Sequence, residues 1–570
     1  MLLSPASRDP EEVRTSIRTL TSLLHRFNVQ KLPSKSPKDI PRLLRHFTTL
    51  LTCGERGDEQ AKKVIAVTGA IDATNRVKTL VVAQNWSVVP SMKTHYVKLI
   101  EKDERSLDEV VKGATSVPLA LHIADVWVAL SAFSPRAHNS DSQVESLQLF
   151  FLSRSYRKFL ARFKEGKKLC GGRWLHEVID NWTSNHPEIP CEWVVVPNWL
   201  LGLPDIPSIK SRKVGEQVQW EFSDDTKQAW AKVLQIMMED LHDWTEAVKS
   251  ANMERSPEKK ADAMRNLNQL CAALDYFISW EKGIVQSLLT KTNIVAGITT
   301  AFMPEDRSNS PDETDDEIDE LVQEPGETQG QQVYRYLRTI VAWHTAVRSL
   351  TEDAAIAQVL RNLQIGLVEV PPSPSTVLTL PQVSEALLAR FPDMRKSGED
   401  DLLTTLTTRY SNKFTGCVHA VAALMGLVNY YGAQLTRTGQ GAEMEIENAQ
   451  QLRDLIQPVA EAGNAVIAVS KKCCWCCDWL GGHLDAQFQL PGTHGLMFPW
   501  DPPVVGVDMS VLKTLEAKLW EELHRVVSSE LRELLYSRHS SAPSSLEGTT
   551  TETMRFVTKA YERPKKQRQA

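Results

Sequence analysis

No apolar run in this sequence reaches the length of about 18 residues that a membrane-spanning helix requires. The stretch that comes closest, residues 117–133, is interrupted by His122 and Asp125 and therefore predicts a buried helix. Residues 1–5 lack the basic start and the long apolar core of a secretory signal. These absences favour an intracellular protein, in the cytoplasm or the nucleus, that has no contact with a membrane.

Neither sign of charge dominates, because 65 Lys and Arg residues oppose 71 Asp and Glu residues and the formal net charge is −6. The segment from Glu305 to Glu327 holds eleven acidic residues and one basic residue, a balance of −10. The rest of the chain therefore carries −6 minus −10, which is +4. A charge this small does not by itself indicate a nucleic-acid partner, and the composition identifies no protein partner.

Helical patterns dominate the first half of the chain. Apolar residues at helical spacing predict helices over residues 11–27, 40–51, 145–163, 226–248 and 260–289. We therefore expect residues 1–303 to form a mainly α-helical region. The acidic, proline-containing segment 304–332 predicts a disordered linker, and residues 333–375 predict a helical connector. Residues 538–570, which begin with a run rich in Ser and Thr, predict a disordered tail.

Four of the nine cysteines fall within five residues: Cys473, Cys474, Cys476 and Cys477. Vicinal cysteines suit a disulfide framework poorly, so the cluster predicts a thiolate site in a reduced, intracellular protein. The apolar residues 465–469 before the cluster predict a strand, and the glycines that follow mark the end of a short helix. A Cys-x-x-Cys pair in the first turn of that helix would lie on one face, near amides that stabilise thiolates.

Such a pair supplies only two of the four ligands that zinc requires. An apolar helix predicted over residues 418–435 has His419 near its start. Two parallel helices on one face of a sheet would bring their N-termini, and therefore the histidine and the cysteine pair, together. One imidazole, two thiolates and an open fourth position form the pattern of a catalytic zinc site rather than a structural one. A redox-active Cys-x-x-Cys pair is the weaker alternative, since thioredoxin-like sites require no such histidine.

These residues resemble the zinc deaminases of the cytidine-deaminase-like superfamily, in which a His-Ala pair begins one helix and Cys-x-x-Cys begins the next. The closer resemblance is to a fungal deaminase-like family related to predicted deaminase domains of bacterial polymorphic toxins. The matching residues are Ser470, Lys471, Cys474 and Cys477, then Gly-Thr-His-Gly at 492–495 and Pro-Trp at 499–500. The resemblance covers about residues 400–535 and implies a zinc-dependent hydrolase that deaminates a nucleobase in a nucleotide or nucleic acid.

The resemblance also implies a set of site residues: His419, Cys474 and Cys477 as Zn²⁺ ligands, with His494 and Trp500 in the substrate pocket. The pairing of Cys473 with Cys476 has the same spacing and stays open. The implied fold is a C-terminal α/β three-layer domain over residues 376–537, which follows the large α-helical N-terminal part. Within this domain we expect strands near 465–470 and 486–490 and a long helix over 510–536.

One position departs from the resemblance. The catalytic glutamate of the superfamily belongs two residues after the histidine, where this chain has Val421. That glutamate transfers protons between the zinc-bound water and the base, which valine cannot do. We therefore expect lost or weakened catalysis, with an active deaminase that uses Glu443, Glu445 or Glu447 as the alternative. The hairpin expected before the first helix finds only weak candidates, at residues 404–408 and 413–417.

Overall fold

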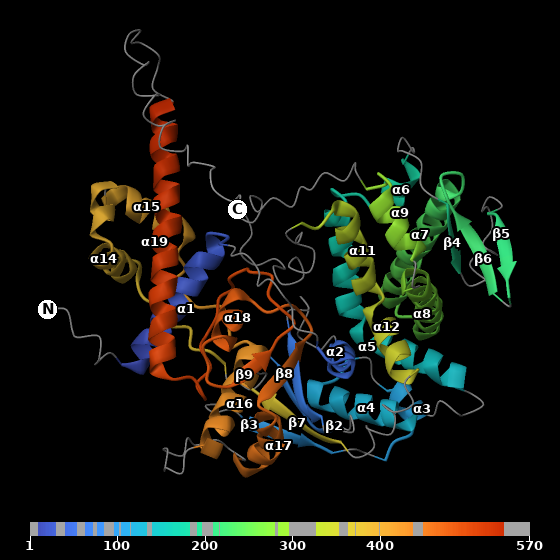
Figure 1. Ribbon diagram of the computed structural model, residues 1–570, viewed down its shortest axis with the longest axis horizontal. Coiled ribbons are helices and arrows are strands. Elements are labelled where there is room, and N and C mark those ends of the chain that lie inside the picture. The colour runs from blue at the N-terminus through green and yellow to red at the C-terminus, as the bar shows by residue number, and fades with distance from the viewer. Residues whose placement is uncertain are drawn as a thin grey trace, which may run out of the picture. The chain divides into compact units, whose positions relative to one another are not determined.

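A computed structural model describes residues 9–29, 40–53, 63–71, 77–84, 96–101, 104–113, 116–133, 140–182, 191–195, 209–215, 217–279, 283–295, 326–352, 363–370, 372–397, 399–436 and 449–540. Most of the acidic linker, residues 304–325, and residues 541–570 of the predicted tail lie outside the described residues. The described part mixes helices and strands (Figure 1). Two compact units divide it, one of residues 1–378 and 411–519 and one of residues 379–410 and 520–570.

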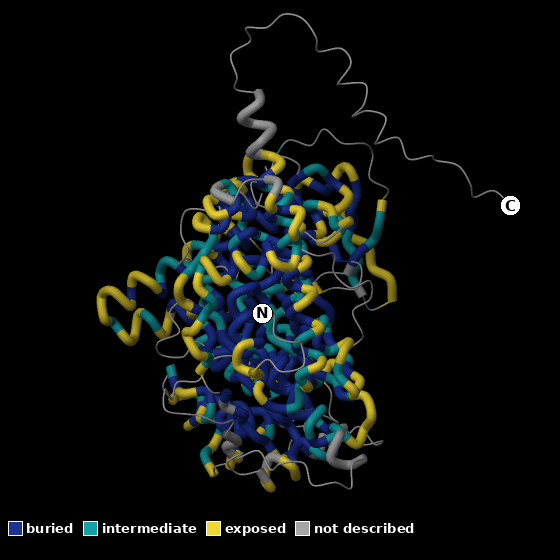
Figure 2. Tube along the Cα trace, turned by 90° about the vertical axis from the view of Figure 1, so that its left-hand side faces the viewer, coloured by how far each residue is buried: buried dark blue, intermediate teal, exposed yellow. Residues whose placement is uncertain are grey.

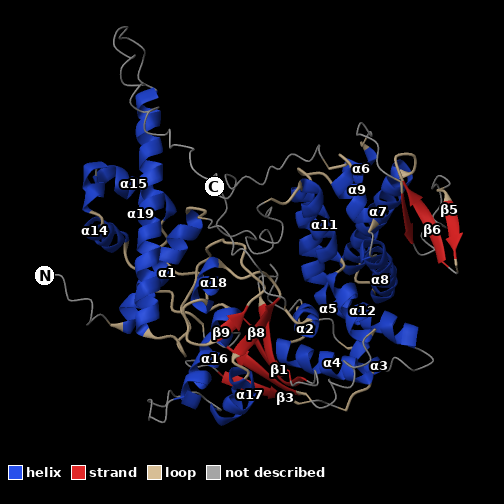
Figure 3. Cartoon of the chain, viewed as in Figure 1, coloured by secondary structure: helices blue, strands red, loops and turns tan. Residues whose placement is uncertain are grey.

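The first unit contains a mixed six-stranded sheet (Figure 3). Its strands follow the order β3-β7-β2-β1-β8-β9. The bounds are β1 (Ile65–Ile71), β2 (Val77–Gln84), β3 (Tyr96–Ile100), β7 (Gln364–Glu369), β8 (Asn464–Val469) and β9 (Gln487–Gln489). Strand β1 is antiparallel to both β2 and β8, whereas β8 and β9 are parallel. The strands predicted near 465–470 and 486–490 are therefore confirmed.

The antiparallel hairpin beside β8 comes from a distant part of the chain. Strands β1 and β2 form it, and Thr68 lies opposite Ile467 of β8. The Thr68 hydroxyl donates a hydrogen bond of 2.7 Å to the Val466 carbonyl. The hairpin predicted from residues 404–408 and 413–417 is wrong, because residues 404–408 lie inside helix α15 (Glu399–Arg409) and 413–417 has only a bridge from Cys417 to Trp500.

The strands of this sheet come from three different regions of the predicted domain organisation. Strands β1, β2 and β3 belong to the expected helical region 1–303, β7 to the connector 333–375, and β8 and β9 to the expected domain 376–537. The physical reason is that residues 65–67 of β1 and 80–83 of β2 are short apolar runs buried in the sheet, without the alternation of apolar and polar residues that marks a strand. Helix α11 (Gln329–Ile340) also begins inside the predicted linker, with a capping box between Thr328 and Gln331.

Helices cover both faces of the sheet (Figure 1). On one face, Ile65 and Val67 of β1 share a buried cluster with Leu44 and Phe47 of α2 (Arg42–Leu50). Helices α16 (Ala420–Thr436) and α17 (Ala449–Glu461) contact β1, β2 and β8. The short helix α18 (Trp475–Gly481) follows β8 and contacts α16. This packing brings the starts of α16 and α18 to the carboxyl end of β8.

The rest of the first unit is mainly helical, as predicted. Its helices are α1 (Pro10–Arg26), α3 (Leu107–Val111), α4 (Leu119–Ala132), α5 (Ser140–Leu169), α6 (Leu175–Asp180), α7 (Lys227–Met253), α8 (Pro257–Ser279), α9 (Ile284–Lys291) and α12 (Ala342–Thr351). A small sheet of order β4-β6-β5 comprises β4 (Glu192–Val195), β5 (Ser211–Val214) and β6 (Gln217–Phe222). Each of these helices contains buried residues, and Figure 2 colours the buried parts of the chain dark blue. No helix of the described residues is long and apolar enough to cross a membrane.

The second unit contains α14 (Leu380–Arg390), the 3₁₀-helix η5 (Pro392–Ser397), α15 and the C-terminal part of α19 (Met509–Ser540). Helix α19 confirms the long helix predicted over residues 510–536. Within this unit Phe391 stacks on His524 with ring centroids 4.2 Å apart. The Arg390 guanidinium lies 5.0 Å from the centre of the Trp520 ring. Aromatic and cation–π contacts therefore join α14 to α19.

Candidate metal centre

The cysteine pair is positioned by the start of α18. Cys474 is the N-cap residue of this helix, with extended backbone angles, and its Sγ accepts the backbone N–H of Cys477 at 3.4 Å. Cys477 lies in the first turn, three residues further on, so both sulfur atoms share one face. A sulfur that accepts a helix N-terminal amide is stabilised as a thiolate. The strand-to-helix connection therefore presents two thiolate-type ligands together.

The histidine comes from the start of α16. His419 directly precedes this helix, and its carbonyl accepts the N–H of Ala423 at 3.0 Å. Its Nδ1 lies 3.3 Å from Sγ of Cys474 and 3.5 Å from Sγ of Cys477. All three ligand atoms lie within 4.8 Å of one another, so the group could hold a metal ion. The structure thus brings together the three residues that the sequence predicted.

These separations suit tetrahedral zinc. With Zn–S near 2.3 Å and Zn–N near 2.1 Å, a tetrahedral angle puts nitrogen and sulfur ligands about 3.6 Å apart. The observed distances of 3.3 and 3.5 Å are close to that value. Both cysteines are buried, whereas His419 is half-buried. Two soft sulfur ligands and one imidazole are the donor types that zinc prefers.

The charge of this cluster is concentrated on Cys474. Burial alone would raise the pKa of the Cys474 thiol, but hydrogen bonds from Cys476 and Cys477 and the neighbouring His419 hold it well below its usual value. Burial and the adjacent Cys474 raise the pKa of Cys477. Proton loss is therefore easier at Cys474 than at Cys477, and a bound cation would favour the deprotonated form of both.

The neighbouring cysteines lie outside the ligand group, although Cys476 hydrogen-bonds to Cys474. The N–H of Cys473 donates to the Gly492 carbonyl at 3.0 Å, and its own carbonyl accepts the Thr493 hydroxyl at 2.7 Å. Cys476 is fully buried in α18. Burial raises the pKa of Cys473, and the hydrogen bond with Cys474 raises that of Cys476. The alternative pairing of Cys473 with Cys476 therefore finds no counterpart in the ligand group that the described residues form.

The two predicted pocket residues have different surroundings. The Nδ1 atom of half-buried His494 accepts the Leu496 N–H at 3.1 Å, so its neutral ring carries the proton on Nε2. Burial lowers the pKa of His494 to about 4, although the negative charge of Cys474 opposes the shift. Trp500 is fully buried, and its backbone N–H donates to the Thr21 hydroxyl at 3.1 Å. His494 therefore interacts with the cluster, whereas Trp500 belongs to the packing beneath it.

Helix α1 holds the segment that follows the site, a role that the sequence did not reveal. The Arg18 guanidinium, 1% exposed, forms an ion pair of 3.1 Å with Asp501. Arg14 donates to the carbonyls of Pro502 and Pro503 at 2.8 and 3.0 Å. Arginine on the buried side of an amphipathic helix was the only available signal, because such a residue needs a partner.

The same segment also packs closely on α16. Gly506 has a φ of 71°, and a Cβ added there would lie 1.8 Å from the carbonyl oxygen of Gly426. Only glycine fits such a backbone-to-backbone approach. The loop that begins with His494 is thereby anchored on α1 and on α16, the helix that supplies His419.

The position of the expected general acid is apolar. Val421 is the second residue of α16 and is 3% exposed. Among the described residues, no Asp or Glu joins the ligand group. Asp478 lies next to Cys477, and burial and Cys474 raise its pKa. The alternative acids Glu443, Glu445 and Glu447 lie outside the described residues.

Comparison with known proteins gives no match: no family model, curated protein or solved structure is similar to this chain.

Proposed function

We propose that His419, Cys474 and Cys477 bind one zinc ion, and that the chain is a deaminase-like protein whose catalysis has been lost or reduced to a trace. The observation that carries the proposal is the convergence of these three ligand atoms within 4.8 Å at the starts of two helices. The protein would then serve as a binding or regulatory module that retains zinc for the integrity of its fold. A nucleotide or nucleic acid is the ligand class that the resemblance implies.

The order of elements around the ligands supports this proposal. The resemblance requires a hairpin, a helix that begins at the histidine, a strand, and a helix that begins at the cysteine pair. The corresponding elements here are β1–β2, α16, β8 and α18, with the additional helix α17 between α16 and β8. The hairpin and α16 are separated in sequence by more than 300 residues, yet β1 pairs directly with β8. A deaminase-like core with a long insertion after its hairpin accounts for this arrangement.

The chemistry explains why we propose a weakened site. A zinc ion bound by three protein ligands acidifies a water molecule at its open position. Deamination further requires a group that carries protons to the ring nitrogen and to the leaving amine. Val421 offers no such group, and loss of a general acid–base residue lowers rates by about 10²–10⁴. Zinc binding and deamination are therefore separable in this chain.

Two measurements on the purified full chain test the proposal. Elemental analysis by plasma mass spectrometry should find one zinc ion per chain. Assays with free nucleosides, single-stranded DNA and RNA should show no deamination above background. Absence of zinc after growth in zinc-supplemented medium would refute the metal site. Robust turnover would instead establish the alternative, an active nucleobase deaminase with its acid outside position 421.

A further inference from the structure

A second feature of the first unit lies apart from the cysteine cluster. A cavity of about 580 Å³ opens between α2, α5, α8, α11 and α12, a volume typical of small-molecule sites. Six arginines line it: Arg42, Arg45, Arg162, Arg335, Arg338 and Arg348. Within the part of the chain that the structure describes, no Asp or Glu lines the cavity. Its wall is therefore strongly cationic.

Some of these arginines are already neutralised. The Arg335 guanidinium makes two hydrogen bonds of 2.9 Å with Glu327. Arg348 forms an ion pair of 2.7 Å with the buried Asp275. Both arginines are half-buried, and neither Glu327 nor Asp275 lines the cavity. These pairs hold the wall in place and leave the remaining positive charge to the other arginines.

Three arginines at the mouth have no such neutralisation. Arg42, Arg45 and Arg338 are exposed, and no carboxylate of the described residues forms an ion pair with any of them. Arg42 donates to the Ser349 hydroxyl at 3.0 Å, which orients its guanidinium across the cavity from α2 to α12. Like charges gathered in this way repel one another, and a bound anion would relieve the repulsion.

The positive electrostatic potential of the cavity affects the protonation of a histidine in its wall. His46 lines the same cavity, and burial followed by the charges of Arg45 and Arg42 lowers its pKa to about 4. It is therefore neutral at pH 7 and adds no further positive charge. The arginines alone provide the cationic surface, and guanidinium groups bind phosphate oxygens in pairs with a planar geometry.

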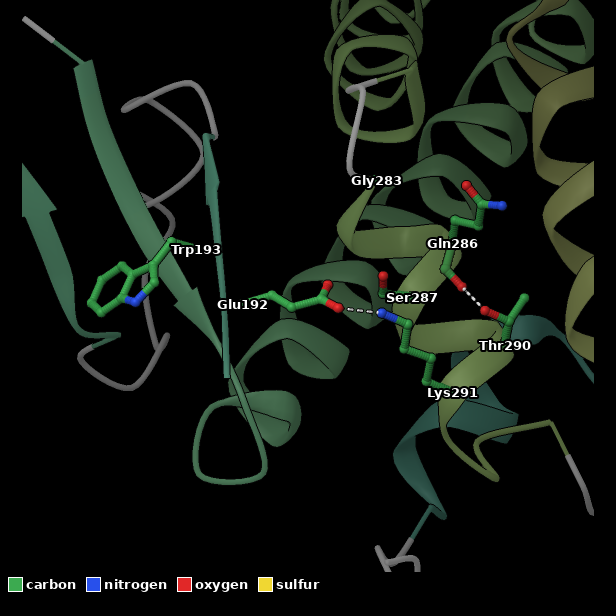
Figure 4. A pocket seen from close by; sticks show the side chains of 7 residues that line it. All are labelled: Glu192, Trp193, Gly283, Gln286, Ser287, Thr290 and Lys291. Carbon is green, nitrogen blue, oxygen red and sulfur yellow. Dashed lines mark hydrogen bonds and ion pairs between the residues drawn. The ribbon is translucent and has the colours of Figure 1, made fainter. Parts of the chain in front are cut away.

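Another cavity of similar size shows the contrast. It measures about 460 Å³ and lies between β4 and α9 (Figure 4). Its Lys291 forms an ion pair of 2.6 Å with Glu192, so this cation is neutralised within the wall itself. At the mouth of the arginine-lined cavity no carboxylate of the described residues pairs with the arginines in this way. This difference favours binding of an anion from outside the protein.

We propose that the arginine-lined cavity binds a small soluble ligand that carries several phosphate groups, with Arg42, Arg45 and Arg338 as its contacts. The proposal does not depend on zinc or on a deaminase-like function. A single phosphate would engage one or two of the guanidinium groups, whereas a chain or ring of phosphates spans both helices. Ser470, which also lines the cavity, lies four residues before Cys474, so the ligand would sit near the segment that carries the cysteines.

Calorimetric titration of the purified full chain at about 150 mM salt, where weak surface attraction is screened, tests this proposal. The probes are adenosine triphosphate, inorganic triphosphate and inositol hexakisphosphate. We expect Arg45→Ala and Arg338→Ala each to lower affinity for the bound probe about tenfold, and the double variant about 100-fold. Tighter binding of adenosine triphosphate than of inorganic triphosphate identifies a nucleotide ligand. Equal binding of these two, or preference for the inositol ring, identifies recognition of the phosphates alone.

Arg265→Ala is the matched control, because Arg265 is exposed on α8, pairs with Asp262 and does not line the cavity. Thermal melting without ligand separates binding from folding. Removal of a mutually repelled arginine should leave the melting temperature unchanged or raise it, while the ligand-induced rise disappears. The proposal fails if the wild type binds none of the probes, or if Arg265→Ala weakens binding equally. It also fails if single-stranded RNA or DNA competes more tightly for the same arginines, which would make the surface a nucleic-acid site.

Discussion

The Nδ1 atom of His419 lies 3.3 Å from Sγ of Cys474, although 55 positions separate the two residues in the sequence. Each stands at the start of a helix, and strand β8 leads directly into the segment that carries Cys474. Hydrogen bonds to the 492–494 segment fix the backbone of Cys473 beside it. The contact is therefore held from both sides by secondary structure, as a pre-formed metal site requires.

The first prediction separates ligand cysteines from their neighbours. Cys474→Ala or Cys477→Ala should reduce bound zinc from about one ion per chain to less than half. The same variants should lower the melting temperature by several degrees, because zinc stabilises the folded state that binds it. Plasma mass spectrometry and differential scanning calorimetry measure the two effects.

Cys476→Ala is the matched control, since Cys476 is equally buried on the same short helix but lies outside the ligand group. It should retain zinc, and it loses the packing of one sulfur atom together with the hydrogen bond between Cys476 and Cys474. If Cys476→Ala and Cys473→Ala lose zinc while the other two variants keep it, the register of the pair is shifted by one residue.

The second prediction concerns the missing acid. Val421→Glu places a carboxylate where the resemblance expects the proton carrier, and we expect detectable deamination of a nucleoside or single-stranded substrate. Val421→Gln has nearly the same shape but cannot transfer protons at neutral pH, so it should stay inactive. Chromatographic detection of the deaminated base measures both. Equal activity in the two variants would show that a group other than residue 421 carries the proton.

Local signals in the sequence were sufficient for the elements that hold the cysteines. The apolar run before Ser470 gave β8, the glycines after Leu480 gave the end of α18, and the regular leucines gave α19. The hairpin failed because its evidence is non-local. The Thr68 hydroxyl donates to a carbonyl that lies 398 residues further along the sequence. No local pattern in a mainly helical region predicts such a partner.

The two candidate sites also differ in whether local sequence patterns could predict them. The three ligands follow from residue type, spacing and resemblance, so they could be predicted before any coordinates. The arginine-lined cavity could not, because arginines three residues apart on a helix look like a solvated face. Arg42 meets Ser349 across 307 positions, and only tertiary packing reveals that the two helices share one cavity.

The third prediction tests the anchor that α1 provides. Arg18→Met should lower the free energy of unfolding by about 3–5 kcal/mol, because it leaves the buried Asp501 carboxylate without its arginine. Replacing both residues, with Arg18→Met and Asp501→Leu, should recover part of the loss. Arg14→Ala removes hydrogen bonds to two carbonyls but leaves the Arg18–Asp501 pair in place, and it should cost about 1–2 kcal/mol. Urea denaturation gives the values, and an Arg18→Met variant as stable as the wild type would contradict the role of this pair.

The last prediction is a loss of stability in mild acid. Burial lowers the pKa of His344 from 6.5 to about 4 and that of His122 to about 3. The unfolded chain, whose histidines have a pKa near 6.5, therefore binds more protons than the folded chain between pH 6.5 and the lowered pKa values. Stability consequently falls as the pH decreases through this range. For His344, a shift of this size corresponds to roughly 3 kcal/mol, present above pH 6.5 and lost progressively down to about pH 4.

Urea denaturation at pH 7.5, 6.0, 5.0 and 4.5 measures this slope. His344→Gln is the informative variant, because an amide does not titrate but can still donate to the Asn268 side chain, which accepts from the histidine ring at 3.0 Å. We expect the variant to be somewhat less stable at pH 7.5, because the shape of the side chain changes, and to lose less stability on acidification. A variant whose stability falls as steeply as that of the wild type would show that His344 is not one of the groups responsible.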